Sequence, residues 1–265
     1  MQSSETLNVL FIGDIVGKSG RQIVKAILPG LVEQYKIEFV IANGENAAGG
    51  FGITENVAQE LFSYGIDLIT TGNHVWDKKE SIPYIAKEAK ILRPLNYPAG
   101  IPGFGSIVTK TKKNNIIAVI NVLGRVFMNL LDCPFRTTEE EIKRIREQTK
   151  FIFIDFHAEA TSEKIAFAYY FDGQVSAIIG THTHVQTADE RILPRGTAYI
   201  TDVGMTGPED SIIGFKKEEV IEKFLTQMPK KFDVPSTASI FSAVVIQVDK
   251  ITATAKNIIR LTLRQ

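Results

Sequence analysis

The sequence predicts an α/β fold, and three observations support this. Short apolar segments rich in β-branched residues alternate with segments of helical periodicity, which is typical of sheets covered by helices. The first 90 residues repeat strand, loop and helix three times, which predicts parallel strands with right-handed crossovers. The chain has 265 residues, of which 44% are hydrophobic and 23% charged, so it can bury a large core without disulfides. No linker rich in Pro, Gly or Ser divides it, and we expect a single domain over residues 1–265.

The N-terminal part is expected to form three units of strand and helix. Pro29 should kink or split the first helix, because proline lacks the N–H that the helix interior needs. Thr54 is a suitable N-cap for the second helix, and Gly65 is a suitable end. Strands are expected at residues 7–13, 38–43 and 66–71, and helices at 21–35, 54–64 and 78–90.

The middle of the chain changes character, and its end returns to strands. Two apolar segments flank the polar residues 112–115, which predicts a hairpin. Thr137 and Glu140 form a capping box that should start a charged helix at residue 138. The hairpin strands are expected at 104–109 and 116–122, helices at 138–150 and 162–171, and further strands at 151–156, 175–180, 197–201, 239–248 and 257–263. We expect one sheet from each half of the chain.

Charge and cysteine content exclude several classes of protein. The 30 Lys and Arg residues balance 30 Asp and Glu residues, which argues against coating nucleic acid or anionic membranes through bulk charge. The single cysteine, Cys133, excludes an internal disulfide framework and a thiolate metal site. The N-terminus lacks the pattern of a signal peptide, and no apolar run reaches the ~18 residues of a membrane span. We therefore expect a soluble cytoplasmic protein without a membrane partner.

Metal-ligating side chains gather at the ends of the predicted strands. In open α/β sheets, ligands bind beyond the carboxyl ends of the strands, where the loops converge. We therefore expect all four histidines, two carboxylates and two carboxamides to lie at one edge of the fold. These residues are Asp14, Glu45, Asn46, Asn73, His74, His157, His182 and His184.

Each of these residues, taken alone, has a purely structural explanation. Asp14 and Asn73 could cap helices, Glu45 could belong to a solvated turn, and His157 could be a core histidine with its hydrogen bonds satisfied. All these explanations would have to hold independently at one edge of the sheet, which is improbable. A functional cluster is the better interpretation.

The residue types in this cluster specify a class of metal. Imidazole, carboxylate and amide donors without thiolate favour iron, manganese or zinc, whereas Mg²⁺ and Ca²⁺ prefer shells of oxygen alone. The number of donors exceeds what one tetrahedral ion needs, and it suits two ions bridged by a carboxylate. Asp14 and Glu45 neutralise two divalent ions only in part, which leaves positive charge for a phosphodiester anion.

In order and spacing, these motifs resemble those of the calcineurin-like metallophosphoesterases, and most closely their bacterial YmdB-type branch. The general pattern of the superfamily begins with D-x-H, but Asp14 here lacks that histidine, and Asn46 stands in for it. Glu45 takes the place of the usual bridging aspartate. Both departures are similar to those of the YmdB-type branch. The matching stretches are GDIVGKSGR, NGENAAGGFGI, GNHVWDKKE, DFHAEATSEK and GTHTHVQTAD.

This resemblance implies a four-layer α/β/β/α sandwich with a dinuclear metal site at the carboxyl ends of the strands. It implies two divalent or trivalent transition-metal ions, iron or manganese, with zinc as a further candidate. His74 would act as the acid. The activity implied is phosphodiester hydrolysis, including cyclic nucleotides such as 2′,3′-cyclic AMP, by two-metal activation of a bridging hydroxide. One ion would be held by Asp14, Glu45, Asn46 and His184, and the other by Glu45, Asn73, His157 and His182.

Other functions stay open at this point. A phosphomonoesterase of the same fold would need extra cations for a dianion, and Lys18, Arg21 and Arg93 are candidates. A non-catalytic regulator could keep the metals and bind RNA, a nucleotide or a protein, but it would not need His74. RNA ends as substrates and a homo-oligomer are also open. The segment 13–19 is one residue short of a phosphate-binding P-loop, and Asp14 would put negative charge inside such a loop.

Overall fold

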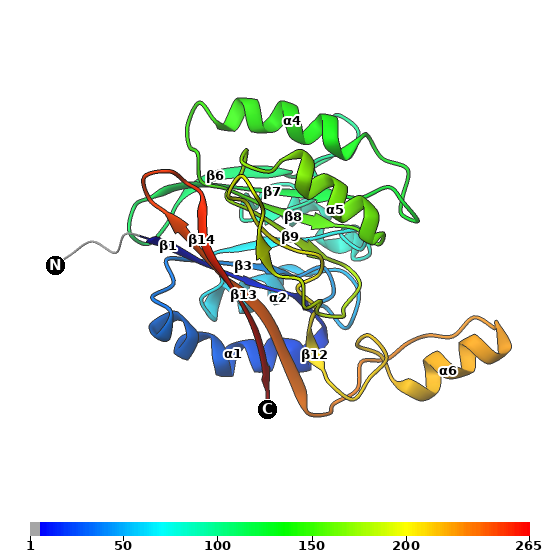
Figure 1. Ribbon diagram of the computed structural model, residues 1–265. Helices are drawn as coiled ribbons and strands as arrows, with labels where there is room; N and C mark the ends of the chain where they lie inside the picture. Colours follow the sequence, from blue (N-terminus) through cyan, green and yellow to red (C-terminus); the bar gives the residue numbers. More distant parts are fainter. Residues whose placement is uncertain (1–5) are drawn as a thin grey trace.

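The computed structural model describes residues 6–265, and these residues form two β-sheets with helices on their outer faces (Figure 1). Residues 1–5, where we expect no signal peptide, lie outside the described part. No helix among the described residues is long and apolar enough to cross a membrane. The two sheets and their helices confirm the predicted mixed α/β architecture.

The first sheet combines strands from both ends of the chain. The strands from the N-terminal part pair in parallel, as the repeated strand and helix units predict. The C-terminal strands join the same sheet, so the expectation of one sheet from each half is wrong for them; the hydrophobic pattern cannot specify which distant strand a segment pairs with. In spatial order the sheet contains β2 (Asp14–Ile15), β12 (Met205–Pro208), β13 (Ser239–Asp249), β1 (Thr6–Ile12), β3 (Phe39–Asn43), β4 (Leu68–Thr70) and β5 (Ile91–Leu92), and β14 (Ala255–Arg264) pairs with β13.

The second sheet comes from the middle of the chain. Its first two strands form the expected antiparallel hairpin, and four of its strands run in parallel. In spatial order it contains β10 (Arg191–Ile192), β11 (Ala198–Ile200), β9 (Ala177–Thr181), β8 (Ile152–His157), β7 (Ile116–Leu123) and β6 (Ser106–Lys110).

Most expected helices are present, with three corrections. The first helix is continuous through Pro29, which lies on its exposed face, where water can take the place of the lost helix bond. The helix expected from the capping box at Thr137 starts earlier, at Pro134, because proline suits the first helical turn. The helix expected at 78–90 is reduced to two short turns. The helices are α1 (Gly17–Gln34), α2 (Glu55–Ser63), the 3₁₀ turn η1 (Lys79–Ser81), α3 (Ile82–Ile85), α4 (Pro134–Ile145), α5 (Thr161–Tyr170) and α6 (Lys217–Thr226).

Three apolar clusters hold these elements together. One contains buried residues from both sheets, among them Phe11 of β1 and Phe153 of β8. A second lies between the first sheet and α1, and a third lies between the second sheet and helices α4 and α5, where Phe156 stacks on Phe167 at 4.0 Å. Helix α6 projects away from the sheets (Figure 1), and only one of its residues, Val220, is buried.

Candidate metal centre

All eight residues predicted for the site lie at or just beyond the carboxyl ends of strands. Asp14 opens β2 directly after β1, and His157 is the last residue of β8. Glu45 and Asn46 follow β3, Asn73 and His74 follow β4, and His182 and His184 follow β9. Polar contacts connect these side chains, as described next, so the predicted convergence at one edge is confirmed.

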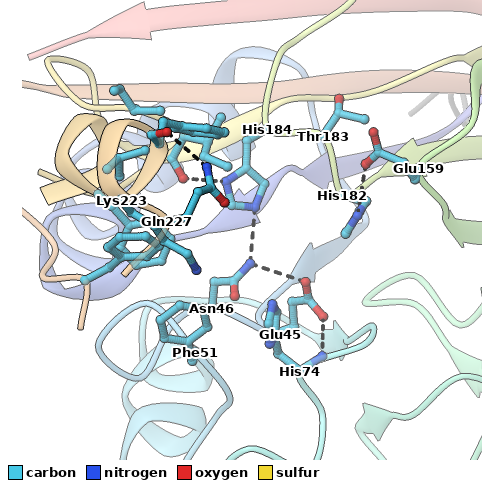
Figure 2. A pocket seen from close by; sticks show the side chains of 16 residues that line it. Glu45, Asn46, Phe51, His74, Glu159, His182, Thr183, His184, Lys223 and Gln227 are labelled. Atoms are coloured by element: carbon cyan, nitrogen blue, oxygen red, sulfur yellow. Dashed lines mark hydrogen bonds and ion pairs between the residues drawn. The ribbon is translucent and has the colours of Figure 1, made fainter. Parts of the chain in front are cut away.

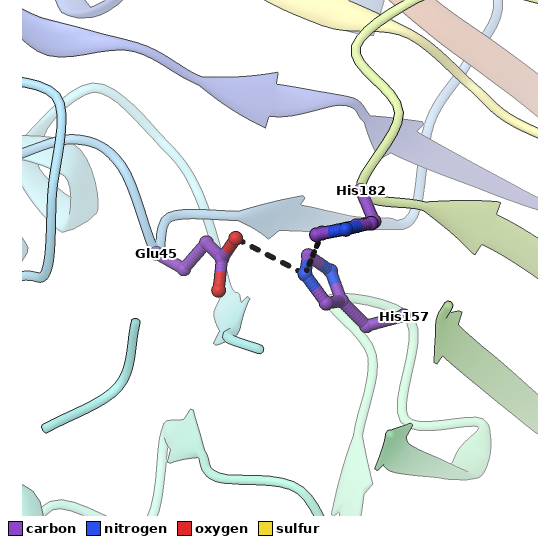
Figure 3. Close-up of side chains that lie close together, drawn as sticks. All are labelled: Glu45, His157 and His182. Atoms are coloured by element: carbon purple, nitrogen blue, oxygen red, sulfur yellow. Dashed lines mark hydrogen bonds and ion pairs between the residues drawn. The ribbon is translucent and has the colours of Figure 1, made fainter. Parts of the chain in front are cut away.

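The centre of this cluster is a group of three side chains from the ends of three strands. Donor atoms of Glu45, His157 and His182 lie within 4.8 Å of one another (Figure 3). His157 Nε2 is 3.1 Å from Glu45 Oε1 and 3.0 Å from His182 Nδ1. Asn73 Oδ1 also lies 3.0 Å from this nitrogen. Four donors therefore converge on one position.

A second group adjoins the first through Glu45. The amide nitrogen of Asn46 lies 3.3 Å from Glu45 Oε1 and 3.2 Å from His184 Nε2 (Figure 2). Asp14 Oδ1 is 3.7 Å from the same His184 nitrogen, and Asp14 Oδ2 accepts a hydrogen bond of 3.2 Å from the backbone N–H of His182. Glu45 therefore lies between the two groups.

Two observations test whether these residues fit metal ions. Asp14 Oδ1 is buried and has no hydrogen-bond partner, which is costly for a carboxylate unless a cation faces it. A side chain at Gly72 would place its Cβ 2.3 Å from His157 Cδ2 and 2.4 Å from Glu45 Oε2, so this position must be glycine for the donors to converge. The donor set, imidazole with carboxylate and amide, suits iron, manganese or zinc. The residues present therefore fit the ions that the sequence predicts.

The electrostatics of the cluster depend on compensation between buried charges. Burial alone would raise the pKa of Glu45, but the neighbouring His157 lowers it to about 2. Burial alone would lower the pKa of His157, but Glu45 and the other carboxylates raise it to about 9. Burial and the charge of His157 together lower the pKa of His182 to about 3. For Asp14, burial outweighs the attraction of the histidines and raises the pKa. The buried carboxylates need a cation that compensates their negative charge. A metal ion can supply the positive charge that the protonated imidazole of His157 supplies in its absence.

A buried carboxylate fixes the orientation of His157. Asp155 accepts hydrogen bonds from the hydroxyls of Thr181 (2.6 Å) and Thr70 (2.5 Å). His157 Nδ1 lies 2.8 Å from Thr181 Oγ1. Because the hydroxyl hydrogen of Thr181 points to Asp155, its oxygen accepts from Nδ1–H. This leaves Nε2 of His157 free to face the other donors. A metal-binding histidine usually donates the hydrogen of its other ring nitrogen in this way.

A buried ion pair holds the turn that carries His182 and His184. Both histidines have positive φ, 105° and 66°, which is uncommon for residues other than glycine. Lys164 of α5 donates to the backbone oxygen of Thr181 at 2.8 Å. It also pairs with Asp202, which accepts from the backbone N–H of Thr183 at 3.0 Å. Sequence reasoning missed this pair, because a lysine in a helix ordinarily faces solvent.

His74 is tied to the same cluster without joining the converging donors. Its backbone N–H donates to Glu45 Oε2 at 3.1 Å. Its Nδ1 lies 2.7 Å from Asp77 Oδ2, and since a carboxylate only accepts, Nδ1 carries the hydrogen. The ring meets Phe51 edge to face, with centroids 5.0 Å apart. The side chain is 28% exposed and can reach a bound ligand. Sequence reasoning did not assign a role to Asp77.

A cavity of about 520 Å³ opens onto the cluster (Figure 2). Glu45, His74, His182 and His184 line it on one side. Helix α6 and the chain beside it supply the apolar side, which includes Val220, Phe215, Phe224 and Phe232. The cavity is larger than a phosphate group needs, and it can hold an organic group attached to the phosphate.

The charged residues of this cavity bear on the choice of substrate. Lys223 is the one lysine or arginine among the described residues that line it. Glu159, which the sequence reasoning missed, also lines it and lies 3.1 Å from His182 Nε2. The cations considered from sequence lie elsewhere. Arg21 binds Glu60 and a backbone oxygen, Arg93 binds backbone oxygens, and Lys18 lines neighbouring cavities.

Comparisons with known proteins identify relatives of this chain. A family model described as YmdB-like protein matches residues 10–261. The chain is 51% identical over 256 residues to a 2′,3′-cyclic-nucleotide 2′-phosphodiesterase of Bacillus subtilis (strain 168), covering 96% of both chains. It is 38% identical to a putative phosphatase/phosphodiesterase of Mycoplasma genitalium, covering 92% of this chain and 88% of the relative.

Solved structures give the same result. A hypothetical protein from Thermus thermophilus superposes with a TM-score of 0.91 at 40% identity, covering 98% of this chain and all of the other. A novel phosphatase from Mycoplasma pneumoniae superposes with a TM-score of 0.91 at 35% identity, covering 98% of this chain and 94% of the other.

Proposed function

Because the chain belongs to the YmdB-like family, we propose that it is a metal-dependent phosphodiesterase that hydrolyses cyclic nucleotides such as 2′,3′-cyclic AMP. The Bacillus relative is named for this class of substrate. The observation that carries the proposal is the convergence of Glu45, His157 and His182 beside a cavity that Glu45, His182 and His74 line. Phosphoester hydrolysis is the chemistry that such a centre supports.

The fold that we propose is one domain, residues 1–265, built as a four-layer α/β/β/α sandwich. An apolar cluster shared by the two sheets supports the inner layers, and the clusters beneath α1 and beneath α4 and α5 support the outer layers. The metal centre would lie where the carboxyl ends of both sheets meet.

Two transition-metal ions, iron or manganese with zinc as a further candidate, would be held by the seven predicted ligands. Glu45 would bridge them, since its carboxylate lies between the two groups of donors. When bound, two such ions neutralise the charge of a phosphodiester and lower the pKa of water, which supplies a nucleophile at neutral pH. Asp14, Glu45, Asn46 and His184 would hold one ion, and Glu45, Asn73, His157 and His182 the other.

His74 would donate a proton to the leaving oxygen. Its backbone contact with Glu45 fixes its position relative to the centre, and Asp77 holds the hydrogen on Nδ1. This leaves Nε2 as the atom that exchanges a proton with the substrate. A binding-only regulator would need the ligands but not this arrangement, so the enzyme is the better interpretation.

Charge in the cavity favours a diester over a monoester. A monoester is a dianion near neutral pH, and it would need cations beyond the metal centre. Lys223 is the one lysine or arginine among the described residues of the cavity wall. Glu159, which lines the same cavity, carries the opposite charge. A diester carries one negative charge and suits this balance better.

The test is metal content and activity measured on the same preparation. Protein purified without chelator and reconstituted with Mn²⁺ or Fe²⁺ should contain close to two ions per chain by elemental analysis. It should hydrolyse 2′,3′-cyclic AMP and bis-p-nitrophenyl phosphate faster than p-nitrophenyl phosphate. One ion or none per chain would contradict the dinuclear centre, and a preference for the monoester would contradict the substrate class.

A further inference from the structure

A second cavity, of about 540 Å³, lies beside the candidate metal pocket and is strongly basic. Four lysines and one acidic residue, Asp233, line it. Phe51 and Phe232 line this cavity and the metal pocket alike, so the two hollows adjoin across these rings. The lysines are Lys18, Lys78, Lys216 and Lys231; we call this hollow the lysine cavity.

Most of the positive charge in the lysine cavity is not neutralised. Lys216 pairs with Asp233 at 3.2 Å. Among the described residues, no carboxylate lies within ion-pair distance of Lys18, Lys78 or Lys231. Three free ammonium groups in one hollow make a site for an anion with several charges.

The positive surface continues beyond the lysine cavity. A further hollow of about 620 Å³ is lined by the cations Lys18, Arg21 and Lys25 and by one acidic residue, Glu60. Lys18 lines both hollows, so they adjoin. Arg21 is paired with Glu60 at 2.9 Å, whereas Lys25 has no described ion pair. The three hollows therefore form a track that leads away from the metal centre.

The backbone of this track is bonded to the loops that carry the ligands. Gly17 N–H, in the first turn of α1, donates to the backbone oxygen of Asn46 at 3.0 Å. Arg21 Nη1 donates to the backbone oxygen of Ala47 at 2.6 Å. Lys78 directly follows Asp77, the partner of His74. A ligand on the track would thus be held in a fixed relation to the metal centre.

The start of α1 adds to the attraction for anions. The first turn of this 18-residue helix contains no acidic residue, so the positive end of the helix dipole is not offset there. Ser19 in this turn lines the lysine cavity, and its buried hydroxyl has no hydrogen-bond partner. The segment that resembles a P-loop in sequence, 13–19, therefore lies beside the lysine cavity.

We propose that the track binds the phosphate backbone of a single-stranded RNA whose 2′,3′-cyclic phosphate end occupies the metal pocket. This rests on the proposed phosphodiesterase function. Lysines along a groove follow a phosphate backbone, and aromatic rings such as Phe51 and Phe232 stack against bases in proteins that bind single strands. The physiological substrate class would then be RNA ends rather than free cyclic nucleotides alone.

Nucleic acid fits the track better than an acidic peptide does. The track leads to a centre whose proposed chemistry is phosphodiester cleavage, and aromatic side chains stand at the passage between the two hollows. The balanced charge of the whole chain keeps general attraction low. Binding should therefore be local, modest in strength and sensitive to salt. The logarithm of the affinity should fall with the logarithm of the salt concentration, with a slope of roughly −0.7 per phosphate contact.

The experiment compares two substrates with the same reacting group, 2′,3′-cyclic AMP and a five-nucleotide RNA that ends in a 2′,3′-cyclic phosphate. The wild type should have at least a tenfold higher kcat/KM for the RNA. The triple variant Lys18→Gln/Lys78→Gln/Lys231→Gln should lose most of this ratio and about two units of salt slope. The control variant Lys87→Gln/Lys110→Gln/Lys150→Gln removes the same charge from exposed positions that line none of the three hollows. It should keep the ratio.

Binding without turnover separates this proposal from the proposed function. Fluorescence anisotropy of a labelled RNA with a 3′-phosphate end should show weaker binding to the triple variant than to the control variant. Failure to hydrolyse any phosphodiester would contradict the enzyme even if this difference in binding remained. Equal kcat/KM for both substrates, or competition by polyglutamate as strong as that by RNA, would overturn the RNA track.

Discussion

Lys164 Nζ lies 2.8 Å from Asp202 Oδ2, and neither side chain is more than 1% exposed. The lysine also donates to the backbone oxygen of Thr181, and the carboxylate accepts from the backbone N–H of Thr183. The pair therefore holds both sides of His182. Buried ion pairs are often no more stabilising than apolar residues of the same volume. We infer that this one is kept because it fixes two histidines in left-handed backbone conformations.

Lys164→Met should destabilise the fold and the centre together. It leaves the Asp202 carboxylate buried without its partner, and breaking such a pair costs roughly 3–5 kcal/mol in the free energy of unfolding. Urea denaturation followed by circular dichroism measures this change. Lys143→Met on α4, where the lysine is 71% exposed, is the matched control and should change stability by about 0.5 kcal/mol or less. Equal effects of the two changes would argue against the clamp.

Thr181→Val should weaken metal binding more than it weakens the fold. Valine keeps the shape but removes the hydroxyl between Asp155 and His157, so His157 loses the contact that orients it. Loss of such a contact typically lowers metal affinity about 10–100-fold. Competition with a chelator measures the affinity. Thr109→Val on β6, remote in sequence from the centre, should leave the affinity unchanged, and an unchanged affinity in Thr181→Val would refute the orienting role.

Gly72→Ala should abolish the metal centre although it adds only a methyl group. The new Cβ would lie 2.3 Å from His157 Cδ2 and 2.4 Å from Glu45 Oε2, so the donors must move apart. Elemental analysis should find little metal in the purified variant. At Gly30 a Cβ would meet nothing within 4 Å, and Gly30→Ala should retain the metal and stabilise the helix by roughly 0.5–1 kcal/mol. Full metal content in Gly72→Ala would show that the donors need not converge.

Glu45→Gln should lose most of both ions and nearly all hydrolysis. A bridging carboxylate serves two ions and reduces their mutual repulsion, and an amide carries no charge to do this. His184→Ala should mainly weaken the ion beside Asp14. Metal content and turnover measured side by side distinguish these variants. If Glu45→Gln retained both ions and full turnover, Glu45 would be a loop residue without a bridging role.

His74→Asn should keep the ions and the fold but lower kcat by about 10²–10⁴-fold, the usual contribution of a general acid. The loss should shrink for a substrate with a good leaving group such as p-nitrophenolate, which needs little protonation. Asp77→Asn should lower kcat less, because it weakens only the contact that fixes His74 Nδ1. An equal loss for every substrate would point to charge stabilisation instead, and unchanged kcat would remove His74 from the reaction.

The sequence was sufficient to predict that the proposed ligands lie close together. Their residue types are unusual at strand ends, and the carboxyl ends of the strands converge at one edge of the fold. Asp14 and His184 are far apart in the chain, yet both follow strands whose apolar pattern is clear. The supporting residues could not be found in this way. Lys164 lies in a helix whose sequence also suits a solvent-exposed lysine, and Asp155 lies inside a buried strand, where only its contacts reveal its function.

The fold was predicted where local patterns decide it. Thr54 does cap α2 through a hydrogen bond with the N–H of Val57, and the N-terminal strands do pair in parallel. The errors lie where distant contacts or competing local signals decide. Helix α4 begins at Pro134 and not at the capping box of Thr137. The placement of β13 and β14 in the first sheet depends on pairing across almost the whole chain, which no local pattern encodes.

The pairing of β2 with β12 has a consequence for how the protein is made. Asp14 lies opposite Met205 in this pair, and β12 is joined to β1 in the sheet through β13. A nascent chain on the ribosome therefore exposes Asp14 long before the strand that fixes it has been synthesised. We expect loading of the centre to be a late step of biogenesis. Truncated chains would then stay free of metal, and bound metal would be confined to molecules whose synthesis is finished.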